Sequence, residues 1–259
     1  MNNLFTFGCS YTDSYLNNMI PPYVEYEKFR GDKSFPRIWN DLLAEKMGLN
    51  LINYGEGGSG NDYIFQMFCK HMYEIDNQDI VIVQWTYNSR FKWTIHKPNG
   101  TKRWVHNMTP LYIEQQQHIS SNLDYDILNE RFSDIIKLER DNPIYLEDVI
   151  HYERVINEIA NHVGFKVYFW DGDFNQNSKI LFAKSTYINR RIGFKYVRNG
   201  KDIFQEAIRR GGQNLWMETD GLIKDTHMGE KGHLKLSEII YEEISSSNYE
   251  YQKKSRTII

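Results

Sequence analysis

The stretch Leu4–Ser10 (Leu-Phe-Thr-Phe-Gly-Cys-Ser) decides how this chain is expected to fold. Its apolar and β-branched residues stop abruptly at Gly8, a pattern that predicts a short buried strand followed by a turn. Ser10 comes directly after that strand, so its hydroxyl is expected at the carboxyl end of a sheet, where open α/β sheets place their sites. A serine in such a turn is also a common helix N-cap, so its position alone leaves both roles open.

The rest of the chain alternates between two hydrophobic patterns. Apolar residues at helical spacing predict helices, and short continuous apolar runs predict buried strands. Gly48 is expected to end the first helix in the left-handed position that favours glycine. Strands separated by helices predict a parallel sheet with right-handed crossovers, in a flavodoxin-like three-layer α/β/α sandwich. Helices are expected over 35–47, 62–73, 146–163 and 229–244, and further strands over 49–54, 79–85 and 165–170.

Residues 1–245 are expected to form a single domain, since 259 residues suffice for one large core with elaborations. Two segments break the alternation, at about 91–150, with a helix-like stretch over 124–138, and at 172–214. We interpret both as insertions at the carboxyl edge of the sheet, where lids and substrate walls arise. Residues 246–259 are polar and are expected to form a loosely held tail.

Composition excludes several classes of partner. The net charge of −3 and the pI near 6.3 give no basic footprint for nucleic acid. Two cysteines imply no disulfide framework and fit a reducing compartment. No apolar run approaches the ~20 residues of a membrane helix, and the amino-terminal run is too short for a signal peptide. We therefore expect a cytoplasmic protein with neither membrane nor nucleic-acid partners.

Four separated segments resemble the sequence blocks of the SGNH, or GDSL-like, hydrolases. Gly8–Thr12 resembles the first block, with Cys9 in place of the usual aspartate. Asn53–Gly58 resembles the second block, in which an asparagine precedes the oxyanion glycine by five positions. The chain is most similar to a divergent subgroup with a Phe-Gly-Cys-Ser-Phe/Tyr-Thr motif that phages often encode, which would place it in a host cytoplasm or a virion.

The third and fourth blocks are matched less closely. Val81–Asn88 resembles the strand that leads to Gly-x-Asn-Asp, but Thr86 and Ser89 replace the glycine and the aspartate. Asp225–His227 resembles the last block, with Asp-x-His where most members have Asp-x-x-His. The four blocks occur in the family's order along the chain, each where a strand is expected to end.

The resemblance implies the SGNH hydrolase fold and a serine esterase that needs no cofactor and no metal. Ser10 is the implied nucleophile, His227 the base and Asp225 the carboxylate that orients it. The backbone N–H groups of Ser10 and Gly58 and the side-chain amide of Asn88 are the implied oxyanion donors. These residue types suit the chemistry, because a serine hydroxyl needs a neighbouring base and the tetrahedral intermediate needs donors aimed at its oxygen.

Several assignments keep an alternative. Gly57 competes with Gly58 as the oxyanion glycine, and Asn88 could be a turn residue. His233 competes with His227 as the base, although it should lie within the last helix and have a structural role. Asp220 or a backbone carbonyl could orient His227 in place of Asp225, because the shorter spacing moves that carboxylate.

Cys9 is a second candidate nucleophile, but side chains alternate along an extended segment, so Cys9 is expected to point away from Ser10 into the core. Asp225, His227 and His233 could in principle bind a metal, although their spacing matches no known site. Trp85, Trp93 and Trp104 suggest a sugar-binding surface, yet tryptophans more often pack in cores.

The sequence therefore predicts an esterase that acts on a small-molecule or glycan O-acyl ester through an acyl-enzyme at Ser10. Two alternatives remain. An acyltransferase would use the same scaffold, and a binding or virion-associated protein could keep the fold without activity.

Overall fold

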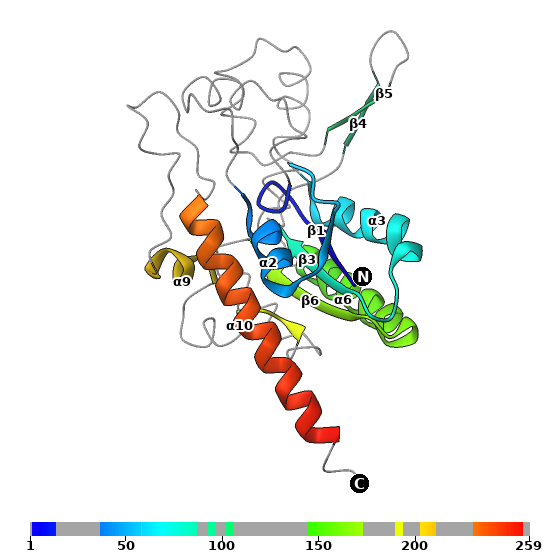
Figure 1. Ribbon diagram of the computed structural model, residues 1–259. Coiled ribbons are helices and arrows are strands. Elements are labelled where there is room, and N and C mark those ends of the chain that lie inside the picture. The colour runs from blue at the N-terminus through cyan, green and yellow to red at the C-terminus, as the bar shows by residue number, and fades with distance from the viewer. Residues whose placement is uncertain are drawn as a thin grey trace, which may run out of the picture.

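The chain folds around a parallel sheet of four strands in the order β2–β1–β3–β6 (Figure 1). These strands are β1 (Asn3–Phe7), β2 (Asn50–Asn53), β3 (Ile80–Trp85) and β6 (Lys166–Asp171). The expected strands are thus confirmed, with ends shifted by a residue or so. The computed structural model describes residues 2–13, 37–57, 59–86, 93–96, 102–105, 144–172, 190–193, 203–210 and 230–255.

Helices cover both faces of the sheet, which confirms the predicted three-layer architecture (Figure 1). Successive side chains of each strand enter opposite layers. Leu4 and Ile82 belong to the apolar core beneath α2 (Trp39–Met47) and α10 (Glu230–Ser255). The opposite core, beneath α3 (Asn61–His71) and α6 (Ile144–Val163), contains Phe5, Phe7, Val81, Val83 and Phe169.

The winding of the chain reverses next to β1. From β1 the chain passes through α2 to β2 on one side, whereas β3 is followed by β6 on the other side. In open α/β sheets ligands bind at such a switch point, which here lies at the carboxyl ends of β1 and β3. Ser10 belongs to the loop that follows β1.

The helix before β2 starts later than predicted and ends where predicted. α2 begins at Trp39, whereas the sequence pattern suggested residue 35. Gly48 adopts φ 67°, and the N–H groups of Gly48 and Leu49 donate to the carbonyls of Glu45 and Ala44 at 3.1 and 2.9 Å. A glycine accepts this left-handed conformation without strain, so the predicted cap is confirmed.

The first predicted insertion contains a hairpin that the sequence pattern did not indicate. β4 (Trp93–His96) and β5 (Lys102–Val105) pair antiparallel. Strands of four residues carry too little alternation to be recognised from sequence. The helix expected over 146–163 is confirmed as α6 and begins at Ile144, whereas the helix-like stretch 124–138 lies outside the described residues.

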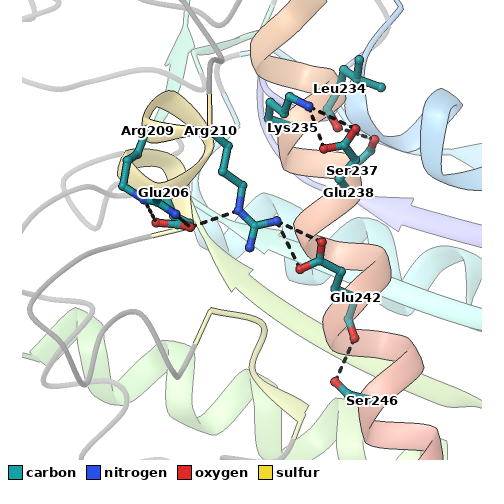
Figure 2. Close-up of polar contacts among 9 residues, drawn as sticks. All are labelled: Glu206, Arg209, Arg210, Leu234, Lys235, Ser237, Glu238, Glu242 and Ser246. Atoms are coloured by element: carbon teal, nitrogen blue, oxygen red, sulfur yellow. Dashed lines mark hydrogen bonds and ion pairs between the residues drawn. The ribbon is translucent and has the colours of Figure 1, made fainter.

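The second predicted insertion includes α9 (Ile203–Arg209), which packs on α10. Ile203 and Ala207 are buried in the core cluster that also contains residues of α10. At the surface Arg210 lies between the Glu206 and Glu242 carboxylates, each at 3.0 Å (Figure 2). Arg210 thus links the buried Glu206 of α9 to the exposed Glu242 of α10, in addition to the burial of apolar side chains between the two helices.

The last helix is longer than the sequence pattern predicted. α10 continues to Ser255, through most of the stretch 246–259 that was expected to be a loosely held tail. The chain contains neither glycine nor proline after Gly232, and helix propagation needs only one hydrogen bond for each further residue fixed. The domain limits at residues 1–245 stay a prediction. Within the described residues, no helix is both long and apolar enough to cross a membrane.

Candidate active site

Ser10 lies in a tight turn directly after β1. The N–H groups of Thr12 and Asp13 both donate to the Cys9 carbonyl, at 2.8 and 2.9 Å. The Ser10 side chain is half-buried in this turn, whereas Cys9 and Thr12 beside it are buried. The hydroxyl therefore stands at the carboxyl end of β1, next to the switch point of the sheet.

Gln84, a fully buried residue near the end of β3, holds this turn in place. Its Oε1 accepts hydrogen bonds from the Cys9 N–H at 3.1 Å and the Thr12 hydroxyl at 2.7 Å. Its Nε2 approaches the Cys9 Sγ at 3.0 Å and the Trp85 carbonyl at 3.3 Å. One side chain thus ties the Ser10 turn to the neighbouring strand, a function that the sequence pattern did not reveal because Gln84 lies within an apolar run.

Two glycines make room for Gln84. A Cβ atom added to Gly8 would lie 2.6 Å from the Gln84 Oε1 and 2.4 Å from the Thr12 Oγ1. A Cβ atom added to Gly172 would lie 2.3 Å from the Gln84 Nε2. Both distances are far below van der Waals contact, so glycine at these positions follows from the space that the amide occupies.

Two buried or half-buried asparagines support the other side of the turn. The Asn53 Nδ2 donates to the Thr12 carbonyl at 2.7 Å, and the Asn40 Nδ2 donates to the same oxygen at 3.1 Å. The Thr6 hydroxyl bridges them, since it accepts from Asn40 at 3.0 Å and donates to the Asn53 Oδ1 at 2.9 Å. The asparagine that opens the second sequence block therefore acts as a support for the Ser10 turn.

The glycine-rich loop after β2 lies against the Ser10 turn. The Asn53 Oδ1 accepts the Gly55 N–H at 2.9 Å, and the Gly8 carbonyl accepts the Glu56 N–H at 3.0 Å. The Gly57 N–H donates to the Asp13 Oδ2 at 2.7 Å. This hydrogen bond occupies the N–H group of Gly57, which the sequence left open as an alternative oxyanion donor.

Asp13 is the charged group of the turn. Its side chain is 4% exposed, and burial, together with the nearby Glu56 carboxylate, raises its pKa from 3.8 to about 6, although the Gly57 N–H favours the ionised form. Glu56 is itself held by the Tyr63 hydroxyl from α3. Sequence reasoning passed over Asp13, since a polar residue in a turn gives no signal by itself.

Cys9 is buried, as predicted, with 1% of its surface exposed in the core beneath α2 and α10. The prediction that Cys9 and Ser10 point in opposite directions is wrong, because the Ser10 Oγ lies 4.0 Å from the Cys9 Sγ. The rule of alternation applies to extended chain, and here the chain turns at Cys9.

His233 has the structural role that its helical position suggested. It is fully buried, and its Nδ1 accepts the Trp39 N–H at 3.3 Å, which joins α10 to the start of α2. The other proposed partners of Ser10 lie outside the described residues and stay predictions: Gly58, Asn88, Asp225 and His227, together with the alternative Asp220. Among the described residues, no three His, Cys, Asp or Glu side chains are grouped to hold a metal ion.

A buried ion network lies beside this edge of the sheet. Arg191 contacts Asp171 at the end of β6, at 2.8 Å, and Glu153 on α6, and the Trp85 indole donates to the same Glu153 at 2.9 Å. Burial raises the pKa of Asp171, and the guanidinium of Arg191 opposes that effect. Loss of one partner would leave an uncompensated buried charge, so the network fixes residues 190–193 against β6 and α6.

No protein-family model and no curated protein sequence matches the chain. Among solved structures, it is similar to a member of the lipolytic protein G-D-S-L family from Veillonella parvula DSM 2008. That match has 13% identity, covers 93% of this chain and 97% of the other, and has a TM-score of 0.41. A protein assigned to the same family from Desulfitobacterium hafniense DCB-2 has 10% identity, coverage of 94% and 99%, and a TM-score of 0.41.

An acetyl xylan esterase is a further similar structure, with 14% identity, coverage of 93% of this chain and 98% of the other, and a TM-score of 0.28. These similarities concern the arrangement of the chain and assign no activity to it.

Proposed function

We propose that the protein is a serine esterase of the SGNH type that hydrolyses a small or carbohydrate-borne O-acyl ester. The observation that carries this proposal is the placement of Ser10. It lies half-buried in a turn at the carboxyl end of β1, at the switch point of a parallel sheet, against a glycine-rich loop. Gln84 and two asparagines hold that turn, which is the rigid support that a nucleophile requires.

In the proposed reaction His227 accepts the proton of the Ser10 hydroxyl while Oγ attacks the ester carbonyl carbon. The Ser10 and Gly58 N–H groups and the Asn88 amide stabilise the resulting oxyanion. The carbon–oxygen bond to the alcohol then breaks, and His227 gives its proton to the leaving oxygen. Water attacks the acyl-enzyme with His227 as base, which releases the carboxylic acid and restores Ser10. Asp225 orients His227 throughout.

The test is covalent labelling by a fluorophosphonate probe together with turnover of p-nitrophenyl acetate. The wild type should react with the probe and hydrolyse the ester. Ser10→Ala should lower the rates of labelling and of hydrolysis by at least about 10⁴-fold, as removal of a serine nucleophile does in other enzymes. Ser246→Ala is the matched control, since this hydroxyl lies on the exposed side of α10 and, among the described residues, donates only to carbonyls of its own helix (Figure 2).

Other results would contradict the proposal in distinct ways. An inert wild type would favour a binding protein that keeps the fold. Labelling that survives Ser10→Ala but is lost in Cys9→Ala would make Cys9 the nucleophile. Transfer of the acetyl group to an added alcohol in preference to water would identify an acyltransferase.

A further inference from the structure

The glycine-rich loop and the Ser10 turn are joined by a side chain as well as by the main chain. The Gly8 carbonyl accepts the Glu56 N–H, and the Asp13 carboxylate accepts the next N–H along the loop, that of Gly57, at 2.7 Å. Ser10 and Asp13 belong to one turn closed on the Cys9 carbonyl. The geometry of this single turn therefore sets the distance between the serine and the loop.

The surroundings of Asp13 disfavour its charged form, and a purely structural role would not require a charge there. The carboxylate is buried, and the Glu56 carboxylate acts on it from the loop, where the Tyr63 hydroxyl of α3 holds Glu56. Among the described residues, the turn also contacts neutral groups, the Asn40 and Asn53 amides at the Thr12 carbonyl and the Gln84 amide of β3. A hydrogen bond to an ionised acceptor is about twice as strong as a neutral one, so the charge strengthens the hold on Gly57.

We propose that Asp13 is a positioning residue for the esterase reaction: by accepting the Gly57 N–H, its carboxylate fixes the main chain that leads into Gly58, the oxyanion donor. This inference rests on the proposed function of Ser10. In this role Asp13 acts through the Gly57 N–H and needs no contact with a reacting atom. Its loss leaves the donor present but poorly aimed, so the transition state loses more stabilisation than the bound substrate does.

The variants are Asp13→Ala, which removes the acceptor, and Asp13→Asn, whose Oδ1 can accept the same N–H without charge. Asp79→Asn is the matched control. Asp79 is also a buried carboxylate that accepts backbone N–H groups, but it lies at the amino end of the sheet, beside Asn3. All variants are compared at equal folded fraction, measured by thermal unfolding.

Asp13→Ala should lower kcat for the aryl ester by about 10- to 100-fold, less than the ~10²–10³ for deleting an oxyanion donor, with KM within about twofold. Asp13→Asn should recover most of that rate, and Asp79→Asn should leave kcat unchanged. Equal loss of kcat in all three variants, or no loss in Asp13→Ala, would overturn the positioning role.

The Gly57 amide proton provides a readout that does not depend on activity. In the wild type its NMR resonance should titrate with a midpoint near pH 6, the pKa of Asp13, and this titration should vanish in Asp13→Asn. A Gly57 resonance that is indifferent to both pH and substitution refutes the contact itself. A wild type that titrates normally but neither labels nor turns over ester refutes the proposed function of Ser10, and with it the catalytic purpose of the contact.

Discussion

The two ends of the central sheet hold buried aspartates in opposite ways. At the amino end Asp79 accepts the backbone and side-chain N–H groups of Asn3 at 2.8 and 3.1 Å, and the Asp76 N–H at 2.9 Å. These contacts tie the start of β1 to the turn before β3. At the carboxyl end Asp13 accepts the Gly57 N–H but lies near the Glu56 carboxylate, and its pKa is raised to about 6.

We interpret the difference as an amino end arranged for stability and a carboxyl end arranged for the proposed reaction. A carboxylate surrounded by donors stabilises the fold, whereas one placed in a dry site near a second carboxylate costs stability. Proteins retain such costs mainly where chemistry requires them. Three substitutions test this contrast.

The largest effect is expected from Gln84→Leu at the carboxyl end. It leaves the buried Cys9 N–H and Thr12 hydroxyl without their amide partner, which should cost about 3 kcal/mol in the free energy of unfolding. The Ser10 turn should also shift, lowering esterase turnover by about 10²-fold, since small misplacements of reacting groups have effects of this size. Urea unfolding and p-nitrophenyl acetate kinetics measure the two effects.

Gln66→Leu, at an exposed position on α3, is the control and should change neither quantity measurably. If Gln84→Leu proves too unstable, Thr12→Val removes one of the same hydrogen bonds and should show a smaller loss of both. Unchanged turnover in folded Gln84→Leu would mean that the turn does not depend on β3.

An intermediate effect on stability alone is expected from Asp79→Ala at the amino end. Loss of the acceptor for the Asn3 and Asp76 N–H groups should lower the free energy of unfolding by about 2 kcal/mol. Turnover per folded molecule should stay at the wild-type value, because the Ser10 turn lies at the other end of β1. A fall in kcat as large as that in Gln84→Leu would abolish the contrast between the two ends.

The smallest effect, of opposite sign, is expected from Asp13→Asn. The folded protein holds the Asp13 proton more tightly than the unfolded chain, since the pKa rises from 3.8 to about 6. Asp13 therefore lowers stability progressively as the pH rises from about 4 to 6, and this loss persists above pH 6. Removal of the charge should increase the free energy of unfolding at pH 8 by about 1–2 kcal/mol.

The measurement is urea unfolding of the wild type and Asp13→Asn at pH 4 and pH 8. The advantage of the variant should be present at pH 8 and largely absent at pH 4, where Asp13 is protonated in the wild-type fold. A variant that is less stable than the wild type at pH 8 would place Asp13 in the same class as Asp79.

Hydrophobic pattern alone was sufficient for the central elements of the fold. The run Leu4–Phe7 and the apolar stretch of β3 are typical of buried strands, and Gly48 marked a helix end; the structure confirms both. The pattern failed where it was short or polar, in the β4–β5 hairpin and in the extension of α10 to Ser255. Four-residue strands carry little periodicity, and a polar helix continues when nothing in the chain stops it.

The sequence by itself determined the order of strands and helices and the position of Ser10 after the first strand, because burial period and glycine placement are local properties. Only the tertiary structure decided what holds that serine. Gln84 and Asn40 lie far from Ser10 along the chain and contact its turn only once β3 and α2 have packed beside β1. Asp13, in the turn itself, reaches the Gly57 N–H of a separate loop in the same way. The same packing engaged the Gly57 N–H, because a hydrogen bond across the sheet edge depends on distance in space rather than on spacing in sequence.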